Sequence, residues 1–286
     1  MKDTNIQWHP GFAAAMDLEL RENRSDLQYE KEYNLNTKPL EIDLLIIKKK
    51  PDLHLKNEIG QIFRGHNILE YKDPNDQLDV DVFYKVEGYA CLYKSYGATV
   101  DAVKADDVTI TLVREAKPEG LFRYFMKHGY RLSNPYCGIY YVEGTVLFPS
   151  QIIVTKELDW KSHIWLKSLS GKLKKQDMKD LLEHVGQLDG KLDKELASSV
   201  LEVSMRANEQ MIETLIGDDD MSEALLEMMA PIIEPILQRR EESARIQGAV
   251  SLLHDFGHQD TEIKAAIMRK YDITAEEADN YLRNSL

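Results

Sequence analysis

Three charged residues on two apolar segments are the part of this sequence best suited to chemistry. Asp43 interrupts the apolar run 40–47, and Glu70 and Lys72 stand two positions apart in the run 68–72. Side chains alternate along a strand, so Glu70 and Lys72 share one face. Carboxylates in such strands are costly to bury unless they are paired or bound to a metal. Two carboxylates and a lysine on one sheet face therefore predict a site for a divalent cation that positions a water for attack on phosphate.

An aspartate on one strand and a Glu-x-Lys on the next resemble the pattern of the PD-(D/E)XK nuclease superfamily. The run 59–74, which reads IGQIFRGHNILEYKDP, is similar to a bacterial branch of recombination-promoting nucleases and putative transposases. The resemblance covers roughly residues 8–115 and, more loosely, the C-terminal part of the chain. The sequence departs from the pattern at Ile42, where many members have a proline before the aspartate.

The resemblance implies a metal-dependent DNA endonuclease linked to recombination or transposition. It implies that Asp43, Glu70 and the main-chain carbonyl of Tyr71 bind Mg²⁺ or Mn²⁺, with Lys72 orienting or deprotonating the attacking water. It also implies an extra metal-binding carboxylate on the first helix, for which Glu19 is the best placed. The alternative interpretation is structural: an exposed strand end carrying an Asp and a Glu–Lys pair, and a solvated helix face carrying Glu19.

Several other polar residues are secondary candidates, each with a plain structural alternative. Extra carboxylates near the metal, a polar support on the second helix and phosphate contacts are the expected roles. The alternatives are solvated surface positions and, for the helix, a core tyrosine. The extra carboxylates are Glu22 and Glu32, and the polar support on the second helix is Lys85 or Tyr89. The residues expected to contact phosphate are Lys48, Lys49, Lys50, Arg64 and His66.

Composition limits the class of protein. The 286 residues are 43% hydrophobic and 30% charged, with a net charge of −13. Residues 1–160 carry 20 basic and 25 acidic side chains (−5), and residues 161–286 carry 16 and 24 (−8). This acidity argues against a generic nucleic-acid binder, so a nuclease needs a locally basic cleft. With two cysteines, no signal-peptide pattern and no apolar run of about 20 residues, we expect a cytoplasmic protein that does not enter a membrane.

Periodicity predicts an α/β fold with a restriction-endonuclease-like αβββαβ core and a mixed sheet, followed by a helical C-terminal region. The expected domains are residues 1–160, nuclease-like, and 161–286, helical. Short apolar alternation predicts strands and a 3.6-residue period predicts helices. The expected core elements are a helix at 12–23, strands at 27–35, 40–47 and 59–71, a helix at 78–96 and a strand at 108–113. The strand 59–71 is expected either unbroken or with a break near Gly65. A helix at 119–128 and strands at 138–142 and 151–155 follow.

The C-terminal region is expected to serve contacts rather than chemistry. We expect a helix boundary at 217–220, an interruption or kink at Pro231 and Pro235, and a capping box at 274–277. Amphipathic stretches such as 225–233 predict packing on the nuclease core or on a second subunit, hence a homo-oligomer. The alternative function is a catalytically degenerate nuclease fold that acts as an oligomeric or DNA-binding module.

Overall fold

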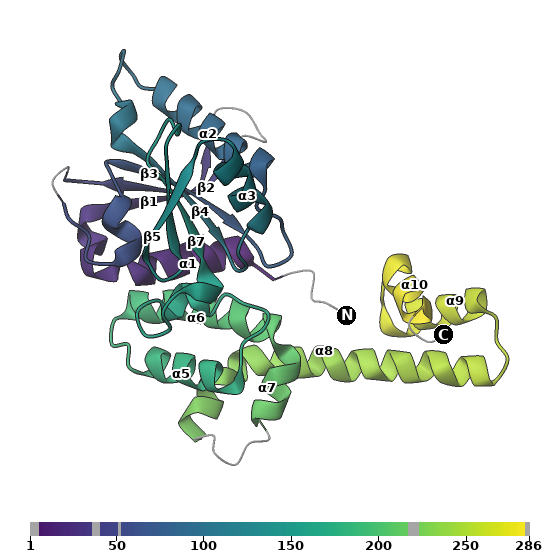
Figure 1. The fold of residues 1–286 in the computed structure, drawn as a ribbon. Coiled ribbons are helices and arrows are strands. Elements are labelled where there is room, and N and C mark those ends of the chain that lie inside the picture. Colours follow the sequence, from purple (N-terminus) through teal and green to yellow (C-terminus); the bar gives the residue numbers. More distant parts are fainter. Residues whose placement is uncertain (1–5, 36–40, 51–52, 217–222, 284–286) are drawn as a thin grey trace. The chain divides into compact units, whose positions relative to one another are not determined.

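The computed structural model describes residues 6–35, 41–50, 53–216 and 223–283. The chain forms two compact units, Met1–Asp219 and Asp220–Leu286. The boundary expected near Trp160 lies inside the first unit, which therefore contains the sheet together with part of the helical region (Figure 1).

The first unit begins with a helix and continues as a mixed α/β structure that ends in four helices. Its elements are α1 (Trp8–Glu19), β1 (Leu27–Asn34), β2 (Glu41–Lys48), β3 (His66–Lys72), α2 (Val80–Ser95), β4 (Val108–Arg114), α3 (Glu119–Lys127), β5 (Arg131–Tyr136), β6 (Ile139–Glu143), β7 (Ser150–Val154), α4 (Ile164–Lys167), α5 (Lys175–Gly186), α6 (Lys191–Ala207) and α7 (Glu209–Ile216). Four short 3₁₀ helices connect them: η1 (Arg21–Asp26), η2 (Glu58–Ile62), η3 (Ala105–Asp107) and η4 (Thr155–Glu157).

The seven strands form one mixed sheet in the order β1-β2-β3-β4-β7-β6-β5. The central pairs β3–β4 and β4–β7 are parallel, and the outer pairs are antiparallel. Nearly every residue of the parallel central strands is buried, as expected for strands covered on both faces. The predicted α/β class, the mixed sheet and the helical C-terminal region are confirmed.

Two strand predictions differ from the structure. The predicted strand 59–71 is a 3₁₀ turn, η2, followed by a shorter strand, β3, because the chain turns at Gly65 before the ladder begins. Sequence reasoning missed β5, which contains Ser133, Asn134 and Pro135. These residues have low strand propensity, and the β5–β6 register shifts between Ser133 and Tyr136.

Helix α1 lies between the sheet and the helical layer (Figure 1). Nine of its twelve residues are buried, so both sides of the helix are covered. On the sheet side Phe12 stacks on Tyr71 of β3, with ring centroids 4.8 Å apart. On the other side the backbone at Gly11 is so close to α6 that a Cβ there would be 2.8 Å from Val203 Cγ2. Gly11 therefore permits the close approach of α1 and α6.

Helices α2 and α3 cover the other face of the sheet (Figure 1). The core beneath them is built from aliphatic strand residues and from aromatic residues of the two helices. Its buried members include Ile42, Leu45, Ile68, Ile110, Leu112, Ile152, Phe83, Val86, Tyr89, Phe122 and Phe125.

The second unit contains α8 (Glu223–Asp255), α9 (Asp260–Tyr271) and α10 (Ala275–Arg283), with a small apolar core of its own. The expected boundary at 217–220 lies outside the described residues. Helix α8 runs through Pro231 and Pro235, so the expected interruption is wrong, and the kink stays a prediction. The capping box is confirmed, since Thr274 and Glu277 bond reciprocally. No helix within the described ranges is long and apolar enough to cross a membrane.

Candidate functional site

The candidate site lies at the point where β2 and β3 stop pairing with each other. Their antiparallel ladder ends at the pair Leu44–Leu69, one residue before Asp43 and Glu70. Beyond that point the carboxylate of Asp43 replaces the ladder, because its Oδ2 accepts a hydrogen bond of 2.8 Å from the main-chain N–H of Tyr71. The carboxylate of Asp43 therefore lies between β2 and β3 just beyond their last paired residues, at a position that we call the gap.

The regular alternation of β2 also breaks at Asp43. Ile42 and Leu45 both enter the core beneath α2 and α3, although they are three positions apart. Opposite the break, the β1–β2 register passes from Lys31–Leu44 to Tyr33–Ile42 and skips Glu32, whose φ is 50°. That left-handed conformation costs a non-glycine residue on the order of 1 kcal/mol. The irregularity turns Asp43 out of the usual strand orientation.

Glu70 is buried and is bonded by two lysines. Its side chain is 3% exposed. Lys72 Nζ, on the same strand, lies 2.9 Å from Glu70 Oε1, and Lys85 Nζ, from α2, lies 3.4 Å from the same oxygen. The pKa of Lys85 is raised, because Glu70 and Tyr89 together outweigh the opposing effect of burial. Both ammonium groups therefore bond the same carboxyl oxygen of Glu70.

Asp43 is a carboxyl group whose pKa is raised. Burial, followed by the negative charge of Glu70, raises its pKa from 3.8 to about 6, against smaller opposing effects of Tyr71 N–H, His9 and Lys72. His9 Nε2, near the start of α1, lies 3.6 Å from Asp43 Oδ2. The structure therefore brings Asp43, Glu70 and Lys72 together as the sequence predicted, and adds His9, which sequence reasoning missed because it lies 34 positions from Asp43 in a different element.

The oxygen atoms at the gap suit a hard divalent cation. The N–H and C=O of one strand residue point toward the same neighbouring strand, so the carbonyl of Tyr71 faces the side on which Asp43 lies. Asp43, Glu70 and that carbonyl give an all-oxygen donor set. Within the described part of the chain there is no group of three or more His, Cys, Asp or Glu side chains that could hold a metal. Mg²⁺ commonly uses only one or two carboxylates and completes its shell with water and phosphate, so the residues fit that ion.

Glu19 does not belong to this site. His9 and Glu19 lie at opposite ends of α1, ten residues and therefore about 15 Å apart. The Glu19 carboxylate accepts hydrogen bonds from Asn57 Nδ2 at 3.2 Å and from the N–H of Leu166 at 3.2 Å, and it contacts His163 Nδ1 at 3.1 Å. The structure does not bring Glu19 to Asp43 and Glu70, because sequence spacing indicates a helix face but not which end of the helix meets the strand.

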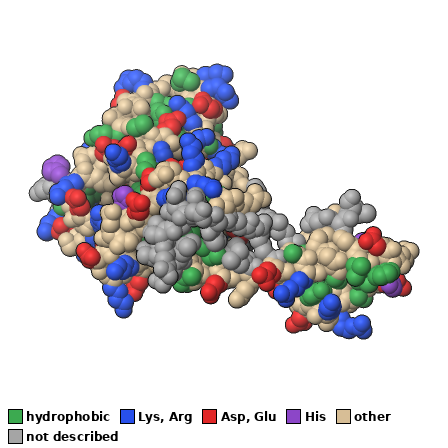
Figure 2. Space-filling view, turned by 90° about the horizontal axis from the view of Figure 1, so that it is seen from below, with side chains coloured by type: hydrophobic (Ala, Val, Ile, Leu, Met, Phe, Trp, Pro, Cys, Tyr) green, Lys and Arg blue, Asp and Glu red, His purple; other side chains and the backbone are tan. Residues whose placement is uncertain are grey.

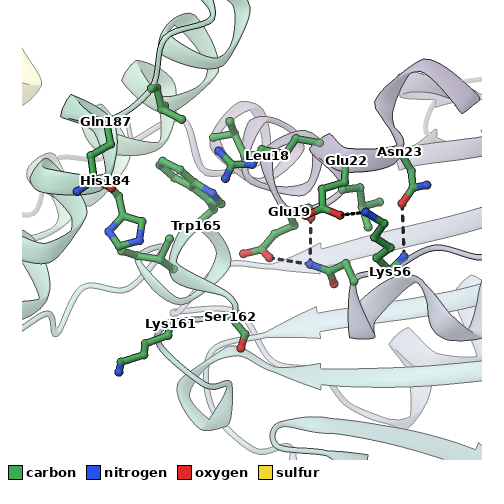
Figure 3. Close-up of a pocket in the computed structure, with 15 residues that line it drawn as sticks. Leu18, Glu19, Glu22, Asn23, Lys56, Lys161, Ser162, Trp165, His184 and Gln187 are labelled. Atoms are coloured by element: carbon green, nitrogen blue, oxygen red, sulfur yellow. Dashed lines mark hydrogen bonds and ion pairs between the residues drawn. The ribbon is translucent and has the colours of Figure 1, made fainter.

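Glu19 instead lines a pocket of about 370 Å³ between α1, η2 and the segment around α4 (Figure 3). His163, 1% exposed, contacts Glu19 with one ring nitrogen and Glu58 Oε2 with the other, at 3.3 Å. Although burial lowers the pKa of His163, the hydrogen bonds and charges of Glu19 and Glu58 raise it overall. This buried cluster fastens α1 to η2 and α4.

Of the secondary candidates, Lys85 of α2 bonds Glu70 at the candidate site, and Tyr89 belongs to the core beneath α2. Glu22 and the expected phosphate contacts lie away from the gap. Glu22 pairs with Lys56 at 2.9 Å in the same pocket, as Figure 3 shows, and Glu32 is exposed. The expected phosphate contacts lie at the opposite ends of β2 and β3 from Asp43 and Glu70. Of these, Lys50 pairs with Asp26 and the His66 ring bonds the hydroxyl of Tyr93. Lys48, Lys49 and Arg64 are at that same end of the sheet.

A further buried carboxyl, Glu87 of α2, is 6% exposed. Burial raises its pKa from 4.5 to about 7, with a smaller opposing effect of Ser150. Glu87 therefore resembles Asp43, because burial is the main cause of the raised pKa in both groups. Comparisons of this chain with family models, with curated proteins and with solved structures find no match.

Proposed function

We propose that this protein is a metal-dependent DNA endonuclease with a restriction-endonuclease-like core, linked to DNA recombination or transposition. The observation that supports it best is the convergence of Asp43, Glu70 and Lys72 at the end of the β2–β3 ladder. The order α1, β1, β2, β3, α2, β4 is that of the αβββαβ core which the resemblance implies. Water would attack the phosphodiester and leave a 5′-phosphate, as the superfamily resemblance implies.

The residues of the chain have separable roles in this proposal. Asp43 and Glu70 hold the cation. Burial and then the charge of Glu70 raise the pKa of Asp43, and a bound cation would offset both effects. Lys72, only 16% exposed, stands beside Glu70, where it can orient a water and stabilise charge that develops on the phosphate. Lys85, 48% exposed, is placed to contact the phosphate from the α2 side. A bound Mg²⁺ or Mn²⁺ would polarise the phosphate and lower the pKa of a bound water.

One observation favours the alternative, a degenerate nuclease fold that acts as a binding module. Asp43 and Glu70 are balanced by Lys72 and Lys85, so the cluster is neutral without a metal. The acidity of the chain is a weaker argument, because acidic and basic side chains are interspersed on the face shown in Figure 2. The two functions differ in one measurable property, since only the first requires a cation for cleavage.

A plasmid-nicking assay tests the proposal. We expect the full-length chain to convert supercoiled to open-circular DNA with Mg²⁺ or Mn²⁺ and not with EDTA. Asp43→Asn and Glu70→Gln should each lower the rate by about 100-fold or more, because each removes a metal-binding charge. The matched controls are Asp106→Asn and Glu183→Gln, which remove the same charges from exposed positions and should nick normally.

The same four variants separate the two functions. Calorimetric titration with Mg²⁺ should show binding to the wild type and to both controls, and none to Asp43→Asn. Wild-type protein that neither binds Mg²⁺ nor nicks DNA would favour the degenerate module. Nicking that persists in both site variants would show that the reaction is carried out elsewhere in the chain.

A further inference from the structure

One segment of this acidic chain is basic and rich in aromatic residues. Residues 117–141 carry four basic side chains and one acidic one, a charge of +3, so the remaining residues carry −16, since −13 − 3 = −16. The segment consists of α3, the turn after it, β5 and the start of β6. Its basic residues are Lys117, Arg123, Lys127 and Arg131, and its aromatic residues are Phe122, Tyr124, Phe125, Tyr130, Tyr136, Tyr140 and Tyr141.

Arg123 and Lys127 are exposed one turn apart on α3, so they project from the same side of the helix. In the described portion of the structure neither has an ion-pair partner. Arg131 follows at the start of β5, where it is 77% exposed and lies 3.6 Å from Glu143 Oε2. An unpaired cation at the surface costs little on its own, but two in succession create a locally positive surface in a negative protein.

Three tyrosine hydroxyls converge beside these cations, and we call Tyr84, Tyr124 and Tyr130 the tyrosine triad. The hydroxyl of Tyr84 lies 3.0 Å from that of Tyr124 and 3.2 Å from that of Tyr130. Two such bonds use two of the three hydroxyl protons, so one proton is left to donate outward. The ring of Tyr84 is 47% exposed, and His128 stacks on Tyr124 with centroids 4.0 Å apart.

The tyrosine triad is close to the candidate site. Tyr84 directly precedes Lys85, whose Nζ lies 3.4 Å from Glu70 Oε1. Adjacent residues on a helix point about 100° apart, so the triad lies around the side of α2 from Glu70 rather than over it. Asp81, one turn before Tyr84, is an acidic neighbour on the same helix. A bound strand that reaches Glu70 can therefore also pass the triad.

We propose that the tyrosine triad, with Arg123 and Lys127, binds single-stranded DNA next to the candidate catalytic site. The inference rests on the proposed function and names the substrate surface for it. The cations and the free hydroxyl proton suit the phosphate backbone, and the exposed ring of Tyr84 suits stacking by an unpaired base. Bases in a duplex are already stacked, so this exposed ring favours a single strand over a duplex.

Binding measured without metal tests this surface independently of cleavage. The full-length chain is titrated, in EDTA, into fluorescein-labelled oligothymidylate of about 16 nucleotides, with a duplex of the same length and with polyglutamate as separate arms. Arg123→Glu/Lys127→Glu should weaken binding about 10-fold or more and reduce the salt slope by about 1.4, at about 0.7 per phosphate contact. The matched control Lys191→Glu/Lys194→Glu reverses two exposed charges on α6 and should bind within about 2-fold of wild type.

Two variants of Tyr84 test the aromatic contribution. Tyr84→Phe keeps the ring and should keep most of the affinity, whereas Tyr84→Ala should lose about 5-fold or more, as for one stacked base. Equal loss of affinity in both variants, or in the α6 control, would overturn the proposal. Tighter binding of the duplex or of polyglutamate would also overturn it, as would no binding by the wild type. Oligonucleotide binding without plasmid nicking would refute only the proposed nuclease activity, and nicking without this binding would refute only the proposed surface.

Discussion

The raised pKa of Asp43 predicts that removing its charge stabilises the protein. Its pKa rises from 3.8 to about 6, which corresponds to about 3 kcal/mol at 1.36 kcal/mol per unit. Because the folded state binds this proton more tightly than the unfolded state, stability falls as the pH rises from 3.8 to about 6 and stays lowered above that pH. Asparagine removes the charge and can still accept the hydrogen bond from Tyr71 N–H.

We therefore expect Asp43→Asn to unfold with a free energy about 1–3 kcal/mol larger than wild type at pH 7.5, and with little difference near pH 4. Urea titrations followed by tryptophan fluorescence give these values, and all three tryptophans, Trp8, Trp160 and Trp165, lie in the first unit. Glu87→Gln provides the comparison, because the pKa of Glu87 is also raised, to about 7, by burial. It should stabilise the protein by a similar amount, with the change centred about one pH unit higher.

Magnesium distinguishes the two variants. Mg²⁺ at ten times its dissociation constant should add about 1.4 kcal/mol to the wild type and to Glu87→Gln. It should add nothing to Asp43→Asn, which lacks the metal-binding charge. An Asp43→Asn protein that is less stable than wild type at pH 7.5 without metal would refute the argument from burial. Equal stabilisation of all three proteins by Mg²⁺ would place the ion elsewhere.

Two further predictions concern Lys72 and His163. Lys72→Arg keeps the positive charge but replaces the compact ammonium by a larger guanidinium. If Lys72 positions the water, Mg²⁺ binding measured by calorimetry should persist while nicking falls by about 100-fold. Near-normal nicking would reduce the role of Lys72 to neutralising charge. His163→Gln leaves Glu19 buried without its cation and should cost about 3 kcal/mol at pH 6, measured by urea titration. Because the pKa of His163 is raised, its stabilising charge is present below pH 6.5 and is lost as the pH passes that raised pKa. The loss of unfolding free energy in His163→Gln should therefore shrink by pH 9. A loss that is the same at both pH values would show that the charge of His163 is not its cause.

The strands and the central carboxylates were accessible from sequence because they violate a simple pattern. Asp43 and Glu70 occur where only apolar residues are expected, and such residues need a physical reason to be there. The same argument could not place Glu19. It is also a buried carboxylate, but its reason is His163, 144 positions away. A sequence pattern reports that a charge is misplaced, whereas only the fold reveals which partner accounts for it.

The break at Asp43 was also beyond sequence reasoning. Nothing in the type of Glu32 indicates a positive φ, because glutamate rarely adopts one. The conformation is imposed by tertiary structure: Ile42 and Leu45 both reach the core only if β2 is irregular between them. Local propensity favoured a plain strand here, and packing overrode it. That override is expected near functional sites, where geometry is held against local preference.

The position of α1 has a consequence for how the chain folds during synthesis. Gly11 packs against Val203, so α1 must wait for residues that are translated 192 positions later before that side of it is covered. At about 5–20 residues per second, that delay is about 10–40 s. For this time the apolar helix that carries His9 has no cover on its α6 side, which makes it a target for chaperones and a route to aggregation. Because His9 of this helix contacts Asp43, one contact of the candidate site is carried by a helix that is covered on both sides only after α6 has been made.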